Sequence, residues 1–223
     1  MRKSEDRENG KSKGRPRGSS GKIRIKRMTA IIEAAEIEFS QKGFAGTSLQ
    51  SIADRAALTK WQIIYFFKTK ENLYKEIINQ IFSEMGSINT FFHEGKPSEV
   101  ISKYIEYLFK LVKVNPHRSK LLVNEMTQGA EFALPILHER RSNKDVNLSV
   151  KHFEQWIAEK KLITIDPLMF MFLLWSAQHF FVVFQPEVAF LMGREKLDDD
   201  DWAHIVTELK TIFLSVFKSN SKK

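Results

Sequence analysis

Two polar and two aromatic side chains gather at the start of a short predicted helix that begins at Lys60. The ammonium group of Lys60 suits a phosphate, and the amide of Gln62 can hydrogen-bond to a base edge. Trp61 and Tyr65 add flat surfaces that carry one polar atom each. A cation, an amide and two aromatic rings on one helix predict contact with DNA, so these four residues form the predicted reading face.

The surrounding residues predict how this face is positioned. Thr59 and Gln62 have the spacing of a capping box, which starts a helix. Apolar residues at helical spacing form the inward side of this helix: Ile63, Ile64 and Phe67. The helix before it has an apolar side of about two turns, made by Leu49, Ile52, Ala53 and Ala56. Two short helices joined by a tight corner at Leu58 and Thr59 predict a helix-turn-helix.

Residues at the two ends of this motif complete the predicted DNA-contacting set. Thr47 and Ser48 offer hydroxyl groups that can cap the first short helix. Thr69 is expected to cap a fourth helix, and Lys70 lies in its first turn, where backbone amides help to hold a phosphate. The set is therefore Thr47, Ser48, Lys60, Trp61, Gln62, Tyr65 and Lys70. The alternative is a generic all-α core in which the aromatic residues only pack.

The chain from Gly43 to Leu73 carries several residue pairs in a fixed order: Thr47-Ser48, Ile52-Ala53, Ala56-Ala57, Tyr65-x-Phe67 and Lys70-Glu71. This order resembles the tetracycline-repressor (TetR) family of bacterial transcription regulators. The resemblance implies a DNA-binding regulator, most often a repressor. Ala57 departs from the family pattern, in which glycine is usual, so it must either take a left-handed backbone conformation or bend the turn differently.

The positive charge of the chain is concentrated at its N-terminus. The formal net charge is +8, and the first 27 residues hold eleven Lys or Arg against three acidic residues, whereas the other residues hold 24 of each sign. A basic arm beside a reading head is typical of nucleic-acid binding, and we expect the binding to depend on salt. Residues 1–21 are predicted to be a disordered basic tail, and residues 219–223 a short second tail.

Within this tail, the segment Lys13-Gly14-Arg15-Pro16-Arg17-Gly18 resembles an AT-hook core. Such a segment can lie extended in the minor groove, where the negative potential attracts its arginines, here Arg15 and Arg17. The alternative is a disordered tail that only improves solubility.

Composition and motifs argue against an enzyme. The chain has no cysteine, and its six histidines form neither an HExxH motif nor a pair four residues apart, so no metal site is indicated. The sequence also lacks a glycine-rich phosphate loop and a GxSxG nucleophile elbow, and no cofactor is expected. The N-terminus is charged and has no apolar core, which excludes a secretory signal and favours a cytoplasmic protein.

Helical periods continue from Lys70 to the C-terminus and predict an all-α protein of two domains. The helix-turn-helix domain is expected over residues 22–74, and a ligand-binding and dimerisation domain over 75–218. Glycine and proline punctuation places the later helices near 70–92, 97–114, 118–128, 133–160, 167–192 and 199–218.

The charge-free stretch from Leu168 to Phe184 has two interpretations. Its length is at the lower limit for a membrane span, but Ser176, Gln178 and His179 interrupt it and no basic flank anchors it. A helix that is apolar all round is also typical of a buried bundle helix, so no membrane association is expected.

The last two predicted helices suggest a homodimer. Residues 202–217 carry a broad apolar face, and together with 167–192 they can form a four-helix bundle across a two-fold axis. In the TetR family the last two long helices usually make this dimer, and two heads would then read the two halves of a palindromic operator in double-stranded DNA. The alternative is that both helices pack inside one chain.

The C-terminal half also resembles one branch of the family, the RutR-like pyrimidine-utilisation regulators. The resemblance rests on Trp156 to Ile163, Asp166-Pro167, Trp175, Asn115-Pro116 and Glu125. It implies a pocket for a small-molecule effector whose occupancy changes the spacing of the two heads. The chain departs from the branch at Met85, where an aromatic residue is usual, and at His179, where an amide is usual.

Imidazole offers a different donor and acceptor pattern from the branch's amide, which argues against a pyrimidine edge as the ligand. The expected ligand has a flat or apolar body, and the expected ligand-binding residues are Met85, Phe109, Phe172, Trp175, Gln178 and His179. For Gln178 and His179 the alternative is a satisfied polar pair in a dimer core.

The sequence therefore predicts a homodimeric, ligand-responsive DNA-binding transcriptional regulator, and most simply a repressor that a small molecule releases from its operator. Two other classes remain open. One is an architectural protein that binds DNA without sequence preference, and the other is a helical protein-interaction module.

Overall fold

The computed structural model describes residues 17–85, 95–142 and 145–217. Within these ranges the chain forms eleven α-helices and no strand, so the all-α prediction is confirmed. An isolated bridge pairs Leu162 with Phe217, where the chain leaves the last helix.

Four helices build the N-terminal head: α1 (Arg17–Gly46), α2 (Leu49–Arg55), α3 (Lys60–Phe67) and α4 (Lys70–Met85). Thr59 starts α3 with the predicted capping box, in which Gln62 returns the hydrogen bond. Ser48 starts α2 in the same way with Ser51. The amide of Asn72 donates to Thr69 Oγ1 over 3.1 Å, which confirms Thr69 as the cap of α4. Serine and threonine hydroxyls thus fix where each short helix begins.

Ala57 settles the geometry of the turn between α2 and α3. Its φ is +52°, so it takes the left-handed conformation that was one of its two alternatives. The preceding residue, Ala56, keeps a right-handed conformation with φ −77°. The turn therefore places a Cβ atom at a left-handed position, where glycine would be unstrained.

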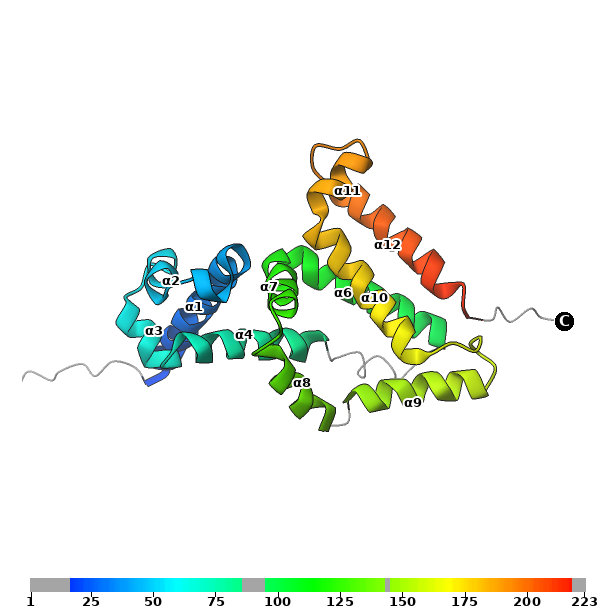
Figure 1. Ribbon diagram of the computed structural model, residues 1–223, viewed down its shortest axis with the longest axis horizontal. Coiled ribbons are helices and arrows are strands. Elements are labelled where there is room, and N and C mark those ends of the chain that lie inside the picture. Colours follow the sequence, from blue (N-terminus) through cyan, green and yellow to red (C-terminus); the bar gives the residue numbers. More distant parts are fainter. Residues whose placement is uncertain (1–16, 86–94, 143–144, 218–223) are drawn as a thin grey trace, which may run out of the picture.

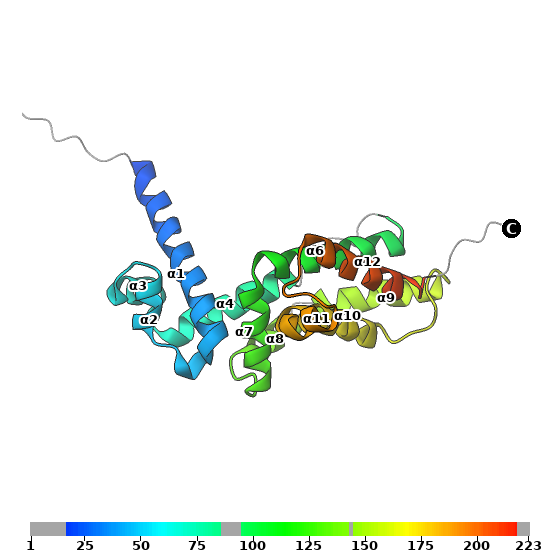
Figure 2. The ribbon, with the colours of Figure 1, turned by 90° about the horizontal axis from the view of Figure 1, so that it is seen from above.

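The remaining helices form the C-terminal part, which the sequence predicts to bind a ligand and which we call the regulatory domain: α6 (Pro97–Val114), α7 (Pro116–Thr127), α8 (Ala133–Ser142), α9 (Asp145–Ala158), α10 (Pro167–Val183), α11 (Gln185–Leu191) and α12 (Asp199–Leu214). Figure 1 shows α7 between the head and the pair α6 and α10, and it contacts both sides. In the view from above, the first turns of α1 project beyond α2 and α3 (Figure 2).

Two hydrophobic cores hold the molecule together. The C-terminal core joins α6, α9, α10, α11 and α12. The head core includes Phe39, Ile52, Ile63 and Tyr74, but it also takes in Leu121 of α7. Because α7 contributes to the head core, the head and the regulatory domain share a packed contact.

Two predicted helices are each divided in the structure. The helix expected over 133–160 is α8 and α9. The helix expected over 167–192 is α10 and α11, which meet at an angle of 82°. Pro186 lies in the first turn of α11, where it has no N–H to donate and its ring would collide with the carbonyl four residues earlier in a continuous helix.

Smaller differences concern the helix ends. The helix predicted over 118–128 begins at Pro116, and the helix predicted over 199–218 ends at Leu214. α4 ends at Met85, and the residues beyond it that were predicted to be helical, 86–92, lie outside the described residues.

Among the described residues, no single helix is long and apolar enough to cross a membrane, although the bent pair α10 and α11 passes that test together.

The left-handed Ala57 leads to a stability prediction. Ala57→Gly should raise the free energy of unfolding by about 1 kcal/mol or less, because relief of left-handed strain outweighs the added freedom of the unfolded chain. Ala56→Gly is the matched control, and it should lower stability because its right-handed backbone gains nothing from glycine. Urea unfolding monitored by circular dichroism measures both. A loss of stability in Ala57→Gly would contradict the assigned backbone conformation.

Candidate nucleic-acid interface and ligand cavity

The predicted reading face lies on the outer surface of α3. Trp61 and Tyr65 are 79% and 65% exposed, and Lys60 is exposed beside them. Gln62 is partly engaged, since its Oε1 accepts hydrogen bonds from the amide and the hydroxyl of Thr59 at 2.9 and 3.2 Å. Its amide nitrogen is thus the group that can donate to a base. Both rings therefore lie open to a binding partner on a helix whose start is capped.

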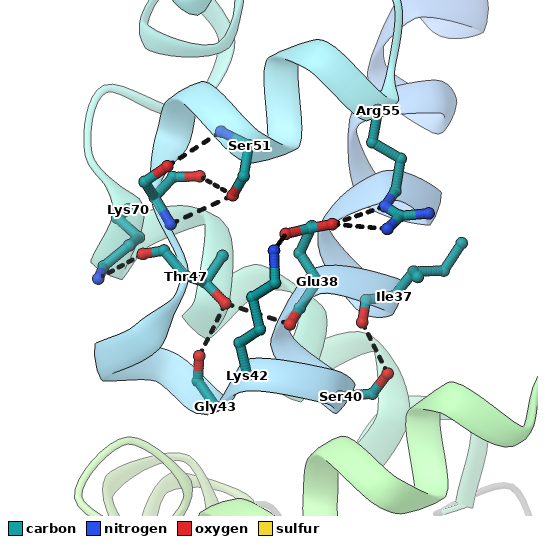
Figure 3. Close-up of polar contacts among 10 residues, drawn as sticks. Ile37, Glu38, Ser40, Lys42, Gly43, Thr47, Ser51, Arg55 and Lys70 are labelled. Carbon is teal, nitrogen blue, oxygen red and sulfur yellow. Dashed lines mark hydrogen bonds and ion pairs between the residues drawn. The ribbon is translucent and has the colours of Figure 1, made fainter.

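A polar network braces the loop before α2 (Figure 3). Thr47 is buried, and its hydroxyl lies 2.8 Å from the carbonyl of Gly43 and 3.2 Å from that of Glu38. This corrects the assignment of Thr47 to the DNA-contacting set, because its side chain has no access to a phosphate. Ser48, by contrast, is exposed at the start of α2.

Lys70 reinforces the same loop. Its ammonium group donates to the carbonyls of Phe44 and Thr47, both over 2.9 Å, and lies 4.3 Å from the centre of the Phe44 ring. Because a lysine ammonium has three N–H groups, one remains for a phosphate. Lys70 therefore stabilises the loop before α2, and its contact with DNA stays a prediction.

Glu38 is a buried carboxylate that joins α1 to α2 (Figure 3). Lys42 Nζ lies 2.7 Å from Glu38 Oε2, and Arg55 NH2 lies 2.7 Å from Glu38 Oε1. The hydrogen bond from Lys42 and that from Arg55 outweigh the effect of burial and lower the pKa of Glu38 to about 2. Arg55, in the last turn of α2, also lies at the favourable end of that helix dipole.

The N-terminal arm is helical where it is described. Residues 21–29 are all exposed, and this stretch carries the cations Lys22, Arg24, Lys26 and Arg27 without an acidic residue. Arg17 is the first residue of α1, so it is helical and not part of an extended segment as predicted. Arg15 lies outside the described residues. The described part of the basic arm is therefore the N-terminal extension of α1.

A small cavity lies where α4, α6, α7 and α10 meet. Its lining residues are Ile81, Glu84, Leu111, Val112, Asn115, Arg118, Ser119, Gln178 and His179. Two of the predicted ligand-binding residues, Gln178 and His179, thus face one cavity, with aliphatic side chains on part of the wall. An apolar wall with a few convergent polar groups is the chemistry of small-molecule sites, but the cavity volume of about 20 Å³ is that of a bound water, so a larger ligand requires the helices around it to move apart.

The two polar residues from α10 are incompletely paired. Gln178 is 2% exposed, yet neither its Oε1 nor the Nδ1 of His179 has a hydrogen-bond partner within the described part of the chain. Burial lowers the pKa of His179, so the ring is neutral at pH 7. Buried polar atoms without partners are costly, which favours a ligand or solvent molecule here over the satisfied pair of the alternative interpretation.

The other predicted ligand residues lie elsewhere. Trp175 Nε1 donates to the hydroxyl of Tyr104 over 3.0 Å and does not line the cavity. Phe109 is buried against Phe181 and Trp202, and Phe172 is exposed on the outer side of α10. Neither Phe109 nor Phe172 lines this cavity, so their part in ligand binding stays a prediction. The side chain of Met85 lies outside the described residues.

The polar wall of the cavity was missed from the sequence. Glu84, Asn115, Arg118 and Ser119 line it, and Arg118 Nε lies 2.7 Å from the buried carboxylate of Glu36. Burial works against the charge of Arg118, but hydrogen bonds to its two glutamate partners raise its pKa. A signal existed, because Glu36 lies in the apolar stretch of α1 and a buried carboxylate requires a partner.

An apolar stripe runs along the outer side of α10. Its exposed residues are Met169, Phe172, Leu173, Phe180 and Phe184. Ile205, Leu209 and Phe213 of α12, in contrast, are buried in the core that includes α6. Both helices therefore bury one side in the same core, α10 also presents an uncovered apolar face, and the dimer stays a prediction.

No group of three or more potential metal ligands is found among the residues that the structure describes.

Comparisons with known proteins agree with this architecture. A model of bacterial regulatory proteins of the tetR family matches residues 31–77, and a model of the C-terminal region of YcdC-like proteins matches residues 74–220. The HTH-type transcriptional regulator RutR of Escherichia coli O157:H7 is 29% identical over 187 residues, covering 83% of this chain and 87% of RutR.

Solved structures show the same fold at lower identity. AibR in complex with isovaleryl coenzyme A and operator DNA aligns with a TM-score of 0.64 and 20% identity, over 86% of this chain and 100% of AibR. The ketosteroid transcriptional regulator KstR2 of Mycobacterium tuberculosis aligns with a TM-score of 0.65 and 16% identity, over 86% of this chain and 96% of KstR2.

The low pKa of Glu38 predicts an acid-sensitive head. In the range between its ordinary pKa of 4.5 and its folded pKa of about 2, the unfolded chain binds the proton more readily, so acid removes the stability that Glu38 contributes. Glu38→Gln should therefore be less stable than the wild type at neutral pH, and the difference should shrink as the pH falls through this range. Chemical denaturation across pH 2–7 checks this.

The matched control is Glu33→Gln, which changes an exposed carboxylate on the same helix. It should leave the pH dependence of unfolding close to that of the wild type. A Glu38→Gln variant whose deficit stays constant over the whole pH range would show that the ion pairs do not stabilise α1 against α2.

Proposed function

The chain belongs to the TetR family of bacterial regulatory proteins, with a RutR-like C-terminal region, and we propose that it acts as a homodimeric repressor released from operator DNA by a small molecule. The family establishes a DNA-binding transcriptional regulator. The dimer, the palindromic operator, the sign of regulation and the effector are our inferences, argued from the arrangement of α3, α10 and the cavity.

The observation that carries the proposal is the exposed surface of α3. Trp61 and Tyr65 lie in solvent on a helix whose start is fixed by Thr59 and whose inner side is anchored by Ile63. We infer that this helix enters the major groove, with Gln62 donating to a base and Lys60 meeting the backbone. The loop that Lys70 stabilises fixes α3 relative to α1, so the reading face is already formed before DNA binds.

The basic arm supports DNA binding through electrostatics. Lys22, Arg24, Lys26 and Arg27 lie on the exposed N-terminal turns of α1, and no acidic residue occurs within residues 21–29. Neutralised phosphates release counterions, so these cations add affinity without sequence preference. We infer that the arm contacts the backbone beside each half-site, while α3 supplies the specificity.

We infer that two chains meet through the apolar stripe of α10. Five large apolar side chains follow one side of this helix, and Leu173 is 63% exposed. Self-association across a two-fold axis would bury this stripe against its own copy. It would also present two α3 helices to DNA, which is the arrangement that a palindrome requires.

We infer that the effector binds in the cavity where α4, α6, α7 and α10 meet. The unpaired Gln178 Oε1 calls for a donor, and the neutral ring of His179 offers one donor and one acceptor. Ile81, Leu111 and Val112 supply apolar contacts. These features favour a small molecule with an apolar body and a hydrogen-bonding group, and a pyrimidine is not specifically required.

Repression and release then follow from a shift between two arrangements of the heads. One arrangement of the heads fits the operator and the other does not. A ligand favours release only if its affinity is higher for the arrangement that does not fit. The AibR complex holds both a ligand and operator DNA, which illustrates that this fold accommodates both partners.

The reading face is tested with DNA fragments selected from genomic DNA by the wild-type protein. Tyr65→Ala should weaken binding to the selected operator by about 1–3 kcal/mol, the scale of a good base contact, and leave binding to unrelated DNA unchanged. Fluorescence anisotropy with both DNAs measures the difference.

Phe190→Ala is the control, because it removes an aromatic ring from α11 that is even more exposed than that of Tyr65. It should leave both affinities unchanged. If Tyr65→Ala weakened the two DNAs alike, the ring would serve general attachment, and an architectural DNA-binding protein would become the better description.

The dimer is tested with Leu173→Asp. A carboxylate in the centre of an apolar contact loses its hydration, so the variant should sediment as a monomer at concentrations where the wild type is a dimer. Its thermal unfolding as a monomer should change little because Leu173 is exposed in one chain. The control Val114→Asp, at an exposed site on α6, should remain dimeric. A wild-type protein that is monomeric at micromolar concentration would exclude the proposed interface.

A further inference from the structure

The chain reverses from α3 to α4 through one strained residue. Lys68 has φ +69° and ψ −57°, and the amide of Thr69 donates to the carbonyl of Phe67 over 2.8 Å. These dihedral angles and this hydrogen bond are those of a γ-turn of the rare, strained form. A residue other than glycine takes this conformation only where the surrounding structure imposes it.

The neighbours of Lys68 leave only this residue to make the turn. Phe67 is buried in the head core at the end of α3, and Thr69 caps α4 by accepting from the amide of Asn72. Glycine would make the same reversal without strain. Within the described residues, glycine does occupy several positions with positive φ: Gly43, Gly95, Gly129 and Gly193. Lysine at position 68 is therefore less stable than glycine, and any advantage of the lysine lies in its side chain.

The side chain of Lys68 lies in line with the reading face of α3. Trp61, Tyr65 and Lys68 follow one another at intervals of four and three residues, so they share one side of the helix and its C-terminal cap. The ammonium group of Lys68 lies 5.9 Å from the centre of the Tyr65 ring, and both side chains are exposed. This distance is near the limit for a cation–π contact, which is weak at an exposed site.

The ammonium group of Lys68 has no competing anionic partner. Among the residues that the structure describes, no hydrogen bond or ion pair holds it, so it is available to an anion from outside the chain. One structural role is open to it, because a cation at the C-terminal end of a helix interacts favourably with the helix dipole. A test has to separate this role from a contact with DNA.

We infer that Lys68 is a further DNA-contacting residue, whose ammonium group the strained turn holds beside the Tyr65 ring and against a backbone phosphate. This inference rests on the proposed function and deepens it. Lys60 and Lys68 lie at opposite ends of α3, so the helix is held to the DNA backbone at both ends. Phosphate contacts fix the register and orientation of a helix, while the side chains between them read the bases.

Lys68→Met tests the phosphate contact, because methionine removes the charge and keeps an unbranched side chain. Binding to the selected operator and to unrelated DNA should weaken alike, by about fivefold near physiological salt. The slope of log affinity against log salt concentration should become shallower by about 1. Lys68→Arg should restore both the affinity and the slope. Fluorescence anisotropy over a salt series measures these values.

Lys68→Gly tests the strain in the turn. This variant should unfold at a temperature about 2–4 °C higher than the wild type, yet bind DNA at least as weakly as Lys68→Met. Lys160→Gly is the matched control, because Lys160 is an exposed lysine with φ +56° that lies two residues after α9. It should also gain stability, but it should leave DNA binding unchanged.

Three results would overturn the inference: an unchanged salt slope in Lys68→Met, as a purely structural role requires, no recovery in Lys68→Arg, or wild-type DNA affinity in Lys68→Gly. A Lys68→Gly variant less stable than the wild type would refute the strained turn. If these variants failed while Tyr65→Ala still lost operator affinity, the proposed function would stand without this contact. A wild-type protein that binds no discrete operator would instead refute the proposed function.

Discussion

Two buried carboxylates on α1 impose the constraint on which the rest of the structure depends. Glu36 and Glu38 lie two residues apart and are both shielded from water, so each must find a charged or hydrogen-bonding partner. Glu38 is satisfied inside the head, by Lys42 and Arg55, and this fixes α2 against α1. Glu36 is satisfied outside it, by Asn115 and Arg118, and this fixes α7 against α1. One helix thus sets both the geometry of the reading head and its attachment to the regulatory domain.

Much of the head could be predicted from the sequence because its signals are local. Capping boxes, apolar faces and the unusual Ala57 all depend on residues within a few positions of each other, and each of them specifies a helix end or a turn. The family resemblance is carried by the same local pattern. The reading face on α3 is exposed as expected, whereas Thr47 is buried because its hydroxyl serves two backbone carbonyls that the sequence does not place.

The regulatory domain was harder to predict because its signals are not local. The apolar run continues past Pro186, and the predicted helix followed that run although the proline marks the break between α10 and α11. The aromatic residues chosen for the ligand site were selected by type, but Phe109 and Phe172 lie on other sides of their helices. Arg118 and Glu84 are separated from Glu36 by more than forty residues along the chain, so their meeting depends on tertiary packing. Glu36, a carboxylate within an apolar stretch, is the sequence signal for such a long-range partner, and it was overlooked.

We propose that two preformed heads read two half-sites of one operator. Hydroxyl-radical footprinting on a DNA fragment selected by the wild-type protein tests this arrangement most directly. We expect a discrete site with two equivalent protected regions related by two-fold symmetry, each centred on one major groove. Uniform protection along the fragment, or protection of a single unpaired region, would contradict it.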